Sequence, residues 1–329
     1  MKKKRLGIIG LSTFVHDSSS CLIDDKGKIL FASAEERFSN NKSDSHIPFF
    51  SLQRCVELAK KNKIKITKIA IAFDPILFLS DDFIKKLNSI LKNTSNEEKF
   101  IKFLKNYNSD KFFNLVFNYK FVEIFLKKNN FKLQPDQIKK IYEYLTYYYN
   151  SMIKYKKVTS IIKNFLPNVE VVNVRHHVAH AASAYFNSGF KDSNILVMDG
   201  KGEDDTVTLF NAKKNVIKEI SKTSWPISLG YLYQLATFTL NYSIGDEFKV
   251  MGMSAYGKNK YLKYIEQCFK INQKGKIIFL PNNYLKIRDY PHTKYEELYF
   301  TKKFTNLVGP VKSKNFTQNH YDLAKSVQT

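Results

Sequence analysis

Three histidines within five residues form the strongest chemical signal in the sequence. His176, His177 and His180 stand in the segment RHHVAH, and the chain has seven histidines in all. Residues four positions apart on a helix lie on one face, about 5–6 Å from each other, so His176 and His180 could ligate one metal ion while His177 points elsewhere. Neutral imidazoles suit iron or zinc. The alternative is a set of packed or surface histidines, because a metal site normally has three or four ligands.

A turn with two glycines, DGKGE, follows directly after the apolar segment NILVM. It runs from Asp199 to Glu203. Glycines at the end of a strand let the backbone approach a phosphate, and their N–H groups can bind its oxygens. The carboxylates could hold a metal–phosphate or a ribose hydroxyl. The motif alone is weak, since many such turns only join two strands of a hairpin.

Three further polar segments carry candidate residues. His16 precedes Asp17 and three serines and could act as a general base toward a hydroxyl, because imidazole exchanges protons near neutral pH; the serines could equally form a turn that satisfies its own backbone. Lys249, in GDEFKVMGM, suits a nucleotide loop or an ordinary polar connection. Lys42 could bind an anion or be a solvated lysine, and Glu35–Arg37 are expected to form an internal ion-pair cluster.

The elements that must position these residues alternate between sheet and helix. Periodicity and turn residues predict strands at 5–11, 20–24, 28–33, 67–73, 170–174, 194–198, 206–210, 216–221 and 276–280. Helices are predicted for FFSLQRCVELAKK after Pro48, VAHAASAYFNS up to Gly189, LGYLYQLATFTL after Ser228, a segment around 260–270 and the terminal HYDLAKSVQT. Residues 75–166 hold no glycine and many aromatics and lysines, so we expect a helical insertion there. The main domain then comprises residues 1–74 and 167–329.

Composition narrows the class of protein. Hydrophobic residues make up 43% and charged residues 25%, as in globular proteins. The three cysteines form no C-x-x-C pair, which fits a reducing cytoplasm. No apolar run is long enough to span a membrane, and the basic, apolar start is interpreted as a strand rather than a signal. The net charge of +23 attracts anions, but its lysines are scattered, which favours solvated helix faces over a nucleic-acid surface.

Six segments, taken in order, carry a more specific signal than any one of them. They are GIIGLSTFVHDSSSCLID, AEERFSNNKSD, VRHHVAHAASAYFNSGF, ILVMDGKGE, SLGYLYQLATFTL and GDEFKVMGMSAYGK. This series resembles the carbamoyltransferase family, which includes nodulation-factor and antibiotic-tailoring O-carbamoyltransferases. The resemblance implies an α/β protein with the actin-like ATPase (ASKHA, ribonuclease H-like) fold, a mixed sheet with flanking helices, whose second half is truncated here.

The resemblance also implies roles for residues. His176 and His180 would ligate a divalent metal ion, expected to be Fe²⁺. The residues expected around the nucleotide are Asp199, Gly200, Gly202, Glu203, Gly230 and Lys249. His16 matches a catalytic histidine, and Lys42 matches a lysine near the path of carbamoyl phosphate. A metal ion and N–H groups would stabilise charge on phosphate and carbonyl while a base deprotonates the alcohol.

In that family a YrdC-like domain makes carbamoyl-adenylate from carbamoyl phosphate and ATP, and the amino-terminal domain passes the carbamoyl group to a hydroxyl. The acceptor is expected to be a small molecule or a sugar. Family members are longer than this chain, and their third metal ligand, an aspartate, is expected beyond Thr329. Either the chain is a fragment, or a separate chain that carries the missing half and the YrdC-like domain is a partner. The alternatives are a tRNA-binding relative of the threonylcarbamoyl-transfer proteins and a non-catalytic remnant.

Overall fold

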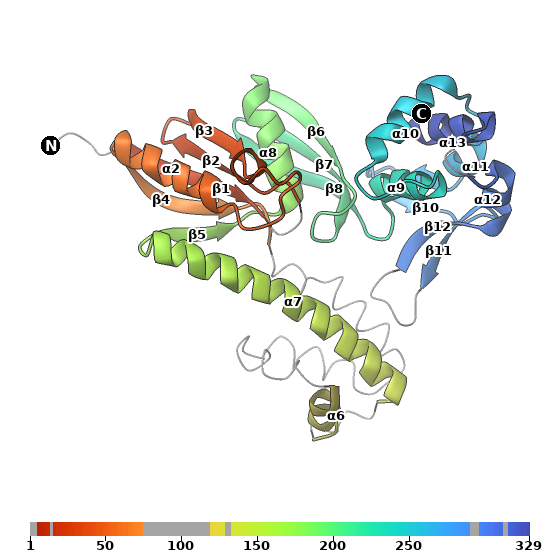
Figure 1. The fold of residues 1–329 in the computed structure, drawn as a ribbon, viewed down its shortest axis with the longest axis horizontal. Helices are drawn as coiled ribbons and strands as arrows, with labels where there is room; N and C mark the ends of the chain where they lie inside the picture. Colours follow the sequence, from red (N-terminus) through yellow and green to blue (C-terminus); the bar gives the residue numbers. More distant parts are fainter. Residues whose placement is uncertain (1–4, 14–15, 75–118, 129–132, 290–295, 312–314) are drawn as a thin grey trace. The chain divides into compact units, whose positions relative to one another are not determined.

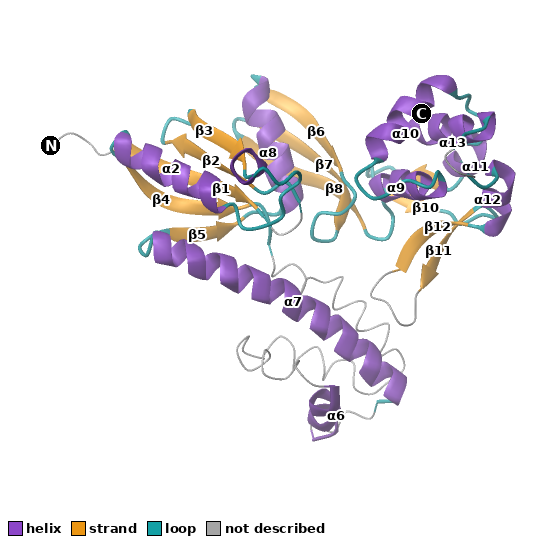
Figure 2. Cartoon of the chain, in the orientation of Figure 1, coloured by secondary structure: helices purple, strands orange, loops and turns teal. Residues whose placement is uncertain are grey.

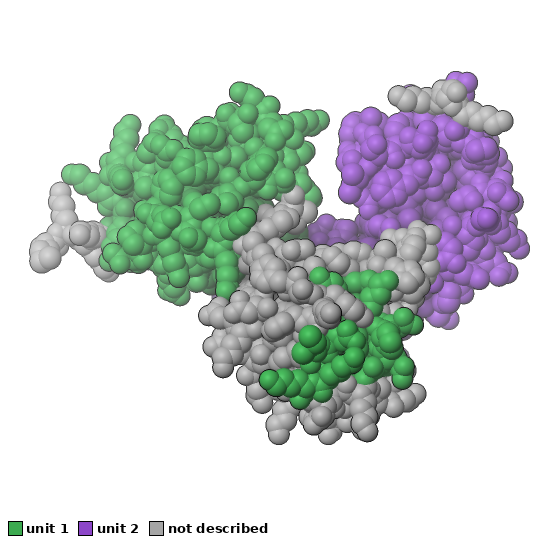
Figure 3. Space-filling view, turned by 60° about the horizontal axis from the view of Figure 1, so that its bottom comes forward, with its two compact units in different colours: residues 1–179 green, residues 180–329 purple. Residues whose placement is uncertain are grey.

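A computed structural model describes residues 5–13, 16–74, 119–128, 133–289, 296–311 and 315–329. The chain divides into two compact units, residues 1–179 and residues 180–329 (Figure 3). Each unit has its own buried apolar cluster. The two units are therefore described one at a time.

The first unit is built on a five-stranded mixed sheet with the order β3-β2-β1-β4-β5. Its strands are β1 (Arg5–Ser12), β2 (Ser19–Asp24), β3 (Ile29–Ala34), β4 (Ile64–Ile71) and β5 (Glu170–Asn173). β1, β2 and β3 are joined antiparallel, whereas β1, β4 and β5 run parallel. Gly27, at φ +79°, closes the predicted turn between β2 and β3. The mixed sheet with its flanking helices (Figures 1 and 2) confirms the predicted mixed α/β architecture.

Helix α2 (Phe49–Lys61) packs against β2 and β4 with the face that its sequence predicts. Leu52, Cys55, Val56 and Ala59 are buried, at the three- and four-residue spacing of one helical face. They join strand residues in the apolar cluster of the first unit. Fully burying an aliphatic side chain of this size contributes about 1.5–3 kcal/mol, so this face fixes the helix on the sheet.

The segment predicted as a helical insertion is described only in its second part. Residues 75–118 and 129–132 lie outside the described residues. Helix α6 (Tyr119–Lys128) lies between these two ranges and α7 (Pro135–Phe165) follows the second; a capping box at Gln134 starts α7. Near its end, α7 places Val158 and Ile162 in the apolar cluster of the first unit. The division of the chain into a main domain and an insertion stays a prediction.

The second unit begins within α8 (His176–Ser188), which runs into an antiparallel sheet with the order β6-β7-β8. Its strands are β6 (Asp192–Met198), β7 (Asp205–Lys213) and β8 (Val216–Ser224). Lys214 and Asn215 join β7 to β8, and their φ angles of +49° and +63° are those of a two-residue hairpin turn. Ile195 and Val197 on β6 are buried, while Leu196 and Met198 on its other face are exposed.

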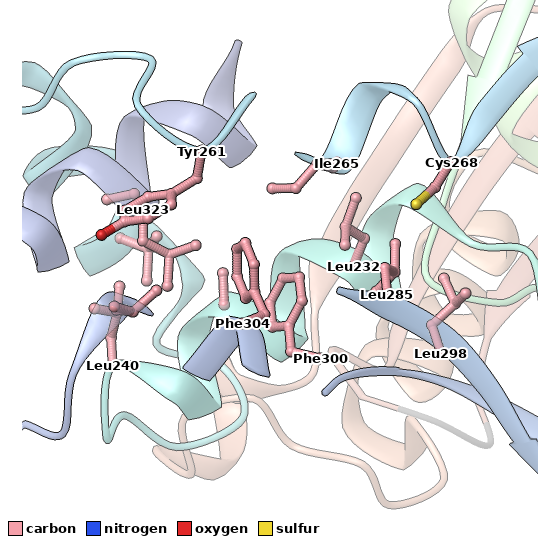
Figure 4. Packing of buried hydrophobic residues seen from close by; sticks show 14 of the residues in the cluster. Leu232, Leu240, Tyr261, Ile265, Cys268, Leu285, Leu298, Phe300, Phe304 and Leu323 are labelled. Atoms are coloured by element: carbon pink, nitrogen blue, oxygen red, sulfur yellow. The ribbon is translucent and has the colours of Figure 1, made fainter. Parts of the chain in front are cut away.

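The rest of the second unit packs helices and two small hairpins around one core. The helices are α9 (Leu229–Thr239), α10 (Glu247–Met253), α11 (Leu262–Glu266), α12 (Lys302–Val308) and α13 (Gln318–Gln328), with a 3-10 turn at Ser254–Tyr256. The hairpins pair β9 (Phe269–Ile271) with β10 (Ile277–Phe279), and β11 (Leu285–Asp289) with β12 (Glu296–Phe300). Tyr261, Phe304 and Leu323 lie at the centre of this core (Figure 4).

Within the described residues, no helix is long and apolar enough to cross a membrane.

Candidate metal centre

Helix α8 carries two of the predicted metal ligands on one face. Its first backbone hydrogen bond joins the Ala179 N–H to the Arg175 carbonyl, at 2.9 Å. His176 is partly buried and His180 exposed, whereas His177 is fully buried. The helix therefore separates the three histidines as their spacing predicts: His176 and His180 lie one turn apart, and His177 packs into the protein.

Asp199 brings a carboxylate to the same place from the sheet. It follows β6 directly, and its N–H donates to the Thr206 carbonyl at 2.9 Å, which fixes the backbone where the hairpin starts. The His180 Nε2 atom lies 3.9 Å from Asp199 Oδ2. One ligand atom each from His176, His180 and Asp199 lie within 4.8 Å of one another. The unit boundary falls after Ala179, but α8 is continuous there, so the helix itself sets the position of His176.

The donor set of this cluster fits a metal ion. Two imidazoles and one carboxylate that leave positions open are the set typical of non-haem Fe²⁺ sites, and zinc accepts the same donors. The sequence predicted Asp199 beside a nucleotide, with the third ligand beyond Thr329. The structure places the Asp199 carboxylate beside the imidazoles, while its contact with a nucleotide and a ligand beyond Thr329 stay predictions. A carboxylate directly after the strand that follows the histidine helix was the signal that could have identified it.

The turn after Asp199 is tightly folded. The Gly200 N–H donates to Asp199 Oδ1 at 2.6 Å, and the Gly202 N–H donates to the Asp205 carbonyl at 2.8 Å. Glu203 is buried beside this turn. Lys201 lies over the Trp225 ring, with Nζ 5.1 Å from the ring centre. The glycines thus serve a compact hairpin, and their contact with a nucleotide stays a prediction.

Helix α9 begins against the backbone of the same turn. The Ser228 hydroxyl donates to the Gly200 carbonyl at 2.7 Å and accepts from the Tyr231 N–H at 3.0 Å, so Ser228 caps α9 and ties it to the turn. A Cβ atom at Gly230 would lie 2.7 Å from Gly200 N and 2.9 Å from Asp199 O. Only glycine permits this approach. Three of the predicted nucleotide residues, Asp199, Gly200 and Gly230, are therefore neighbours at a helix N-terminus, which favours anions.

Lys249 lies on α10 and is held within its own segment. Its Nζ atom is 2.7 Å from Asp246 Oδ1 and 5.3 Å from the centre of the Tyr242 ring. The motif that contains it, GDEFKVMGMSAYGK, forms α10 and the 3-10 turn, which pack against α13. A role of Lys249 toward a nucleotide stays a prediction.

The two predicted catalytic residues, His16 and Lys42, lie in the first unit on exposed loops. His16 Nδ1 is 2.6 Å from Asp17 Oδ2. The two loops are joined, because the Ser18 N–H donates to the Asp44 carbonyl at 2.8 Å. Phe14 and Val15, just before His16, are outside the described residues.

Among the residues that the structure describes, Glu35 makes no ion pair, contrary to the sequence prediction, whereas Glu36 and Arg37 do. Its carboxylate is 2% exposed and accepts the N–H groups of Phe50 and Ser51, at 2.7 and 2.9 Å, in the first turn of α2. Glu36 accepts the Ser43 N–H at 3.0 Å and lies 3.6 Å from the Arg37 guanidinium. These carboxylates hold the loop that carries Lys42, a role that depends on contacts distant in sequence.

A sequence model described as the carbamoyltransferase N-terminus matches residues 7–329. The chain belongs to the carbamoyltransferase family. The match includes His176, His180, Asp199 and the glycines around it, so the candidate metal ligands lie within the part that this family model covers.

This member of the carbamoyltransferase family is similar to curated proteins from different bacteria. It is similar to a protein of Synechocystis described as uncharacterised, with 26% identity over 98% of this chain and 46% of the relative. It is also similar to the nodulation protein NolNO of Sinorhizobium fredii, with 23% identity over 96% of this chain and 37% of the relative. The chain thus spans less than half the length of these two relatives. A solved Ppx/GppA family structure from Aquifex aeolicus is 11% identical over 98% of this chain and 88% of that one, at a TM-score of 0.25, too low to establish a common fold.

Proposed function

We propose that this chain holds a divalent metal ion, Fe²⁺ as expected from the donor set, through His176, His180 and Asp199. We propose further that this centre serves the ATP-dependent transfer of a carbamoyl group from carbamoyl phosphate, through carbamoyl-adenylate, to a hydroxyl of a small molecule or sugar. The observation that supports it most is the convergence of three ligand atoms within 4.8 Å in a carbamoyltransferase family member. The adenylate would form on a YrdC-like domain in the rest of the protein or in a separate chain.

The residues around the cluster suit an anionic substrate. A metal ion held there would supply Lewis-acid stabilisation to a phosphoryl or carbonyl oxygen. The α9 N-terminus, close to Asp199 and Gly200 through Gly230, offers N–H groups and the positive end of a helix dipole. Ser228 keeps that helix end in place by its hydrogen bond to the Gly200 carbonyl. These contacts would orient the phosphate or carbamoyl group without needing a charged side chain.

His16 and Lys42 would handle the proton and the phosphate. With its Nδ1–H toward Asp17 Oδ2, at 2.6 Å, the His16 imidazole would keep Nε2 as the atom that accepts the proton of the acceptor hydroxyl. Lys42 carries a fixed positive charge on the loop tied to the His16 segment by the Ser18–Asp44 hydrogen bond. Its ammonium group suits the phosphate of carbamoyl phosphate.

Metal content of the purified chain tests the centre. After anaerobic loading with Fe²⁺, we expect about one ion per chain, and roughly a tenth or less in His176→Ala, His180→Ala and Asp199→Ala. Matched controls are His46→Ala and Asp25→Ala, which remove an exposed histidine and an exposed aspartate of the first unit and should leave the metal content unchanged. Equal metal content in the ligand variants and the controls would contradict the proposed centre.

A reconstituted reaction tests the transfer. The chain is combined with a polypeptide that carries the part of the curated relatives that this chain does not span and a YrdC-like domain, with ATP, carbamoyl phosphate and a panel of hydroxyl acceptors. We expect a mass gain of one carbamoyl group on an acceptor, lost in His180→Ala. A loaded metal site with no transfer to any acceptor would reject the transferase function while keeping the metal centre.

A further inference from the structure

A cavity of about 550 Å³ lies in the second unit, at the end of the sheet opposite to Asp199. The last turn of α8, the start of β6 and the turn between β7 and β8 line it. β6 has seven residues, from Asp192 beside the cavity to Met198 beside Asp199. At about 3.3 Å per residue, the cavity is therefore on the order of 20 Å from the metal cluster. It is a separate place with its own chemistry.

Two exposed phenylalanines give the cavity an apolar wall. Phe186 and Phe190 are 58% and 67% exposed. The wall is held in shape, because the Tyr185 hydroxyl donates to the Lys191 carbonyl at 2.6 Å and Gly189, at φ +77°, turns the chain after the helix. Covering an exposed aromatic ring with an apolar surface is favourable. Exposed rings in a concave site therefore favour a ligand with an apolar face.

The lining of the cavity also carries positive charge. Lys191 and Lys214 line the cavity, and both are exposed. Asp192 also lines it, but its carboxylate lies 4.0 Å from Lys213 Nζ, so its charge is offset by that lysine. Lys214 and Asn215 form the hairpin turn, both at positive φ, and this turn fixes the position of the Lys214 backbone at the cavity. Within the described part of the chain, the cavity is therefore lined by two exposed aromatic rings and by lysines that give it a net positive charge.

We propose that this cavity binds a small aromatic anion, a planar ring bearing a carboxylate, sulfonate or phosphate group. The ring would contact Phe186 and Phe190, and the anionic group would lie toward Lys191 and Lys214. The orientation follows from the helix as well, because the carbonyl groups at the end of α8 repel an anion and so direct it to the lysines. A volume of about 550 Å³ suits one such molecule rather than an extended peptide. This site does not depend on the proposed carbamoyl transfer.

Phenyl phosphate is the probe, and inorganic phosphate and phenol, its two halves, are the comparison compounds. Their binding to the full chain is measured by titration calorimetry and ligand-observed NMR. We expect phenyl phosphate to bind more tightly than either half. Phe190→Ala and Lys214→Ala should each weaken it by about five- to tenfold, the size expected for losing one ring contact or one charge-assisted contact. Added salt should weaken it further.

Matched controls separate this site from other places on the chain. Phe248→Ala removes an equally exposed ring on α10, 58% exposed, and Lys218→Ala removes an exposed lysine of β8; neither should change the affinity. His180→Ala removes a ligand of the metal centre and should leave phenyl phosphate binding intact. Absence of binding, equal binding in Phe190→Ala and Lys214→Ala, or loss of binding in His180→Ala would each overturn the assignment. Circular dichroism confirms that the variants are folded.

Discussion

Asp44 is a buried carboxylate whose partners keep it ionised. It accepts a hydrogen bond from the Ser39 hydroxyl and further ones from the backbone and ring N–H groups of His46, which lower its pKa from 3.8 to about 2. A carboxylate with a pKa lowered by folding stabilises the folded state above its ordinary pKa. That contribution is lost as the pH falls from about 4 to about 2.

The variant Asp44→Asn should therefore lower the free energy of unfolding at pH 7 and at pH 5. The difference from the unaltered chain should shrink as the pH falls below about 4, because the aspartate of the unfolded chain then takes up a proton while that of the folded chain stays ionised until about pH 2. Urea unfolding at pH 7, 5 and 3 measures it. Asp25→Asn, on the exposed β2–β3 turn, is the control, and a difference that stays constant down to pH 3 would contradict the role of Asp44.

The candidate metal ligands show how much about single residues could be predicted from the sequence. The spacing of His176 and His180 was sufficient to predict one shared face, since a helix of small residues leaves little freedom in where they point. Asp199 was predicted to lie beside a nucleotide, which stays a prediction; its distance from the imidazoles could not be predicted, because sequence does not reveal where β6 ends relative to the helix. Glu35 was placed in an ion-pair cluster because its true partners, the N–H groups of α2, belong to the backbone and leave no mark in the sequence.

Helices and strands likewise differ in how well the sequence predicts them. α2 follows its prediction residue for residue, because a single apolar face on one sheet determines it. The hairpin of β11 and β12 was not predicted, since LKIRD and EELYF are short and charged, and their buried Leu285 and Leu298 find partners only in the folded core. Around residues 260–270 the predicted helix is cut short after Glu266, because the Cys268 carbonyl accepts the Leu280 N–H of the next hairpin.

Gly230 tests how closely α9 must approach the Asp199 turn. Gly230→Ala forces a methyl group into the backbone at 2.7 Å, which should destabilise the second unit by about 1–3 kcal/mol and weaken metal binding. Gly252→Ala is the matched control, because α10 leaves open space around Gly252, and alanine there should stabilise by up to about 1 kcal/mol. Thermal unfolding and metal titration measure both. Equal effects of the two substitutions would contradict the close approach.

Over the whole molecule, three thiols are distributed between the two units, and all are free. Burial raises the pKa of Cys21, that of Cys55 to about 12 and that of Cys268 to about 11, and nearby Cys21 adds to the shift at Cys55. A thiol reacts as its thiolate. The absence of a cysteine motif in the sequence predicted unpaired thiols, but only the packing of the folded units shows that burial raises their pKa values.

The folded chain should therefore react slowly with a disulfide reagent at pH 8. With a pKa of about 12, the Cys55 thiolate fraction at that pH is on the order of one in ten thousand. In urea all three thiols should react at once, as followed by the absorbance of the released thiol. Cys21→Ser identifies the partly exposed thiol, and rapid reaction of Cys55 in the folded chain would contradict its burial.

The position of His176 at the very beginning of α8 has a mechanical consequence. The first turn of a helix frays most readily, because its N–H groups have no acceptor within the helix. An ion bound by His176, His180 and Asp199 would cross-link that turn to the residue after β6. Metal binding would therefore stabilise the helical conformation of the first turn, and an ordered first turn would bind the ion more tightly. Removal of the ion by a chelator would then also let the first turn of α8 unfold, and this turn would become accessible to proteases.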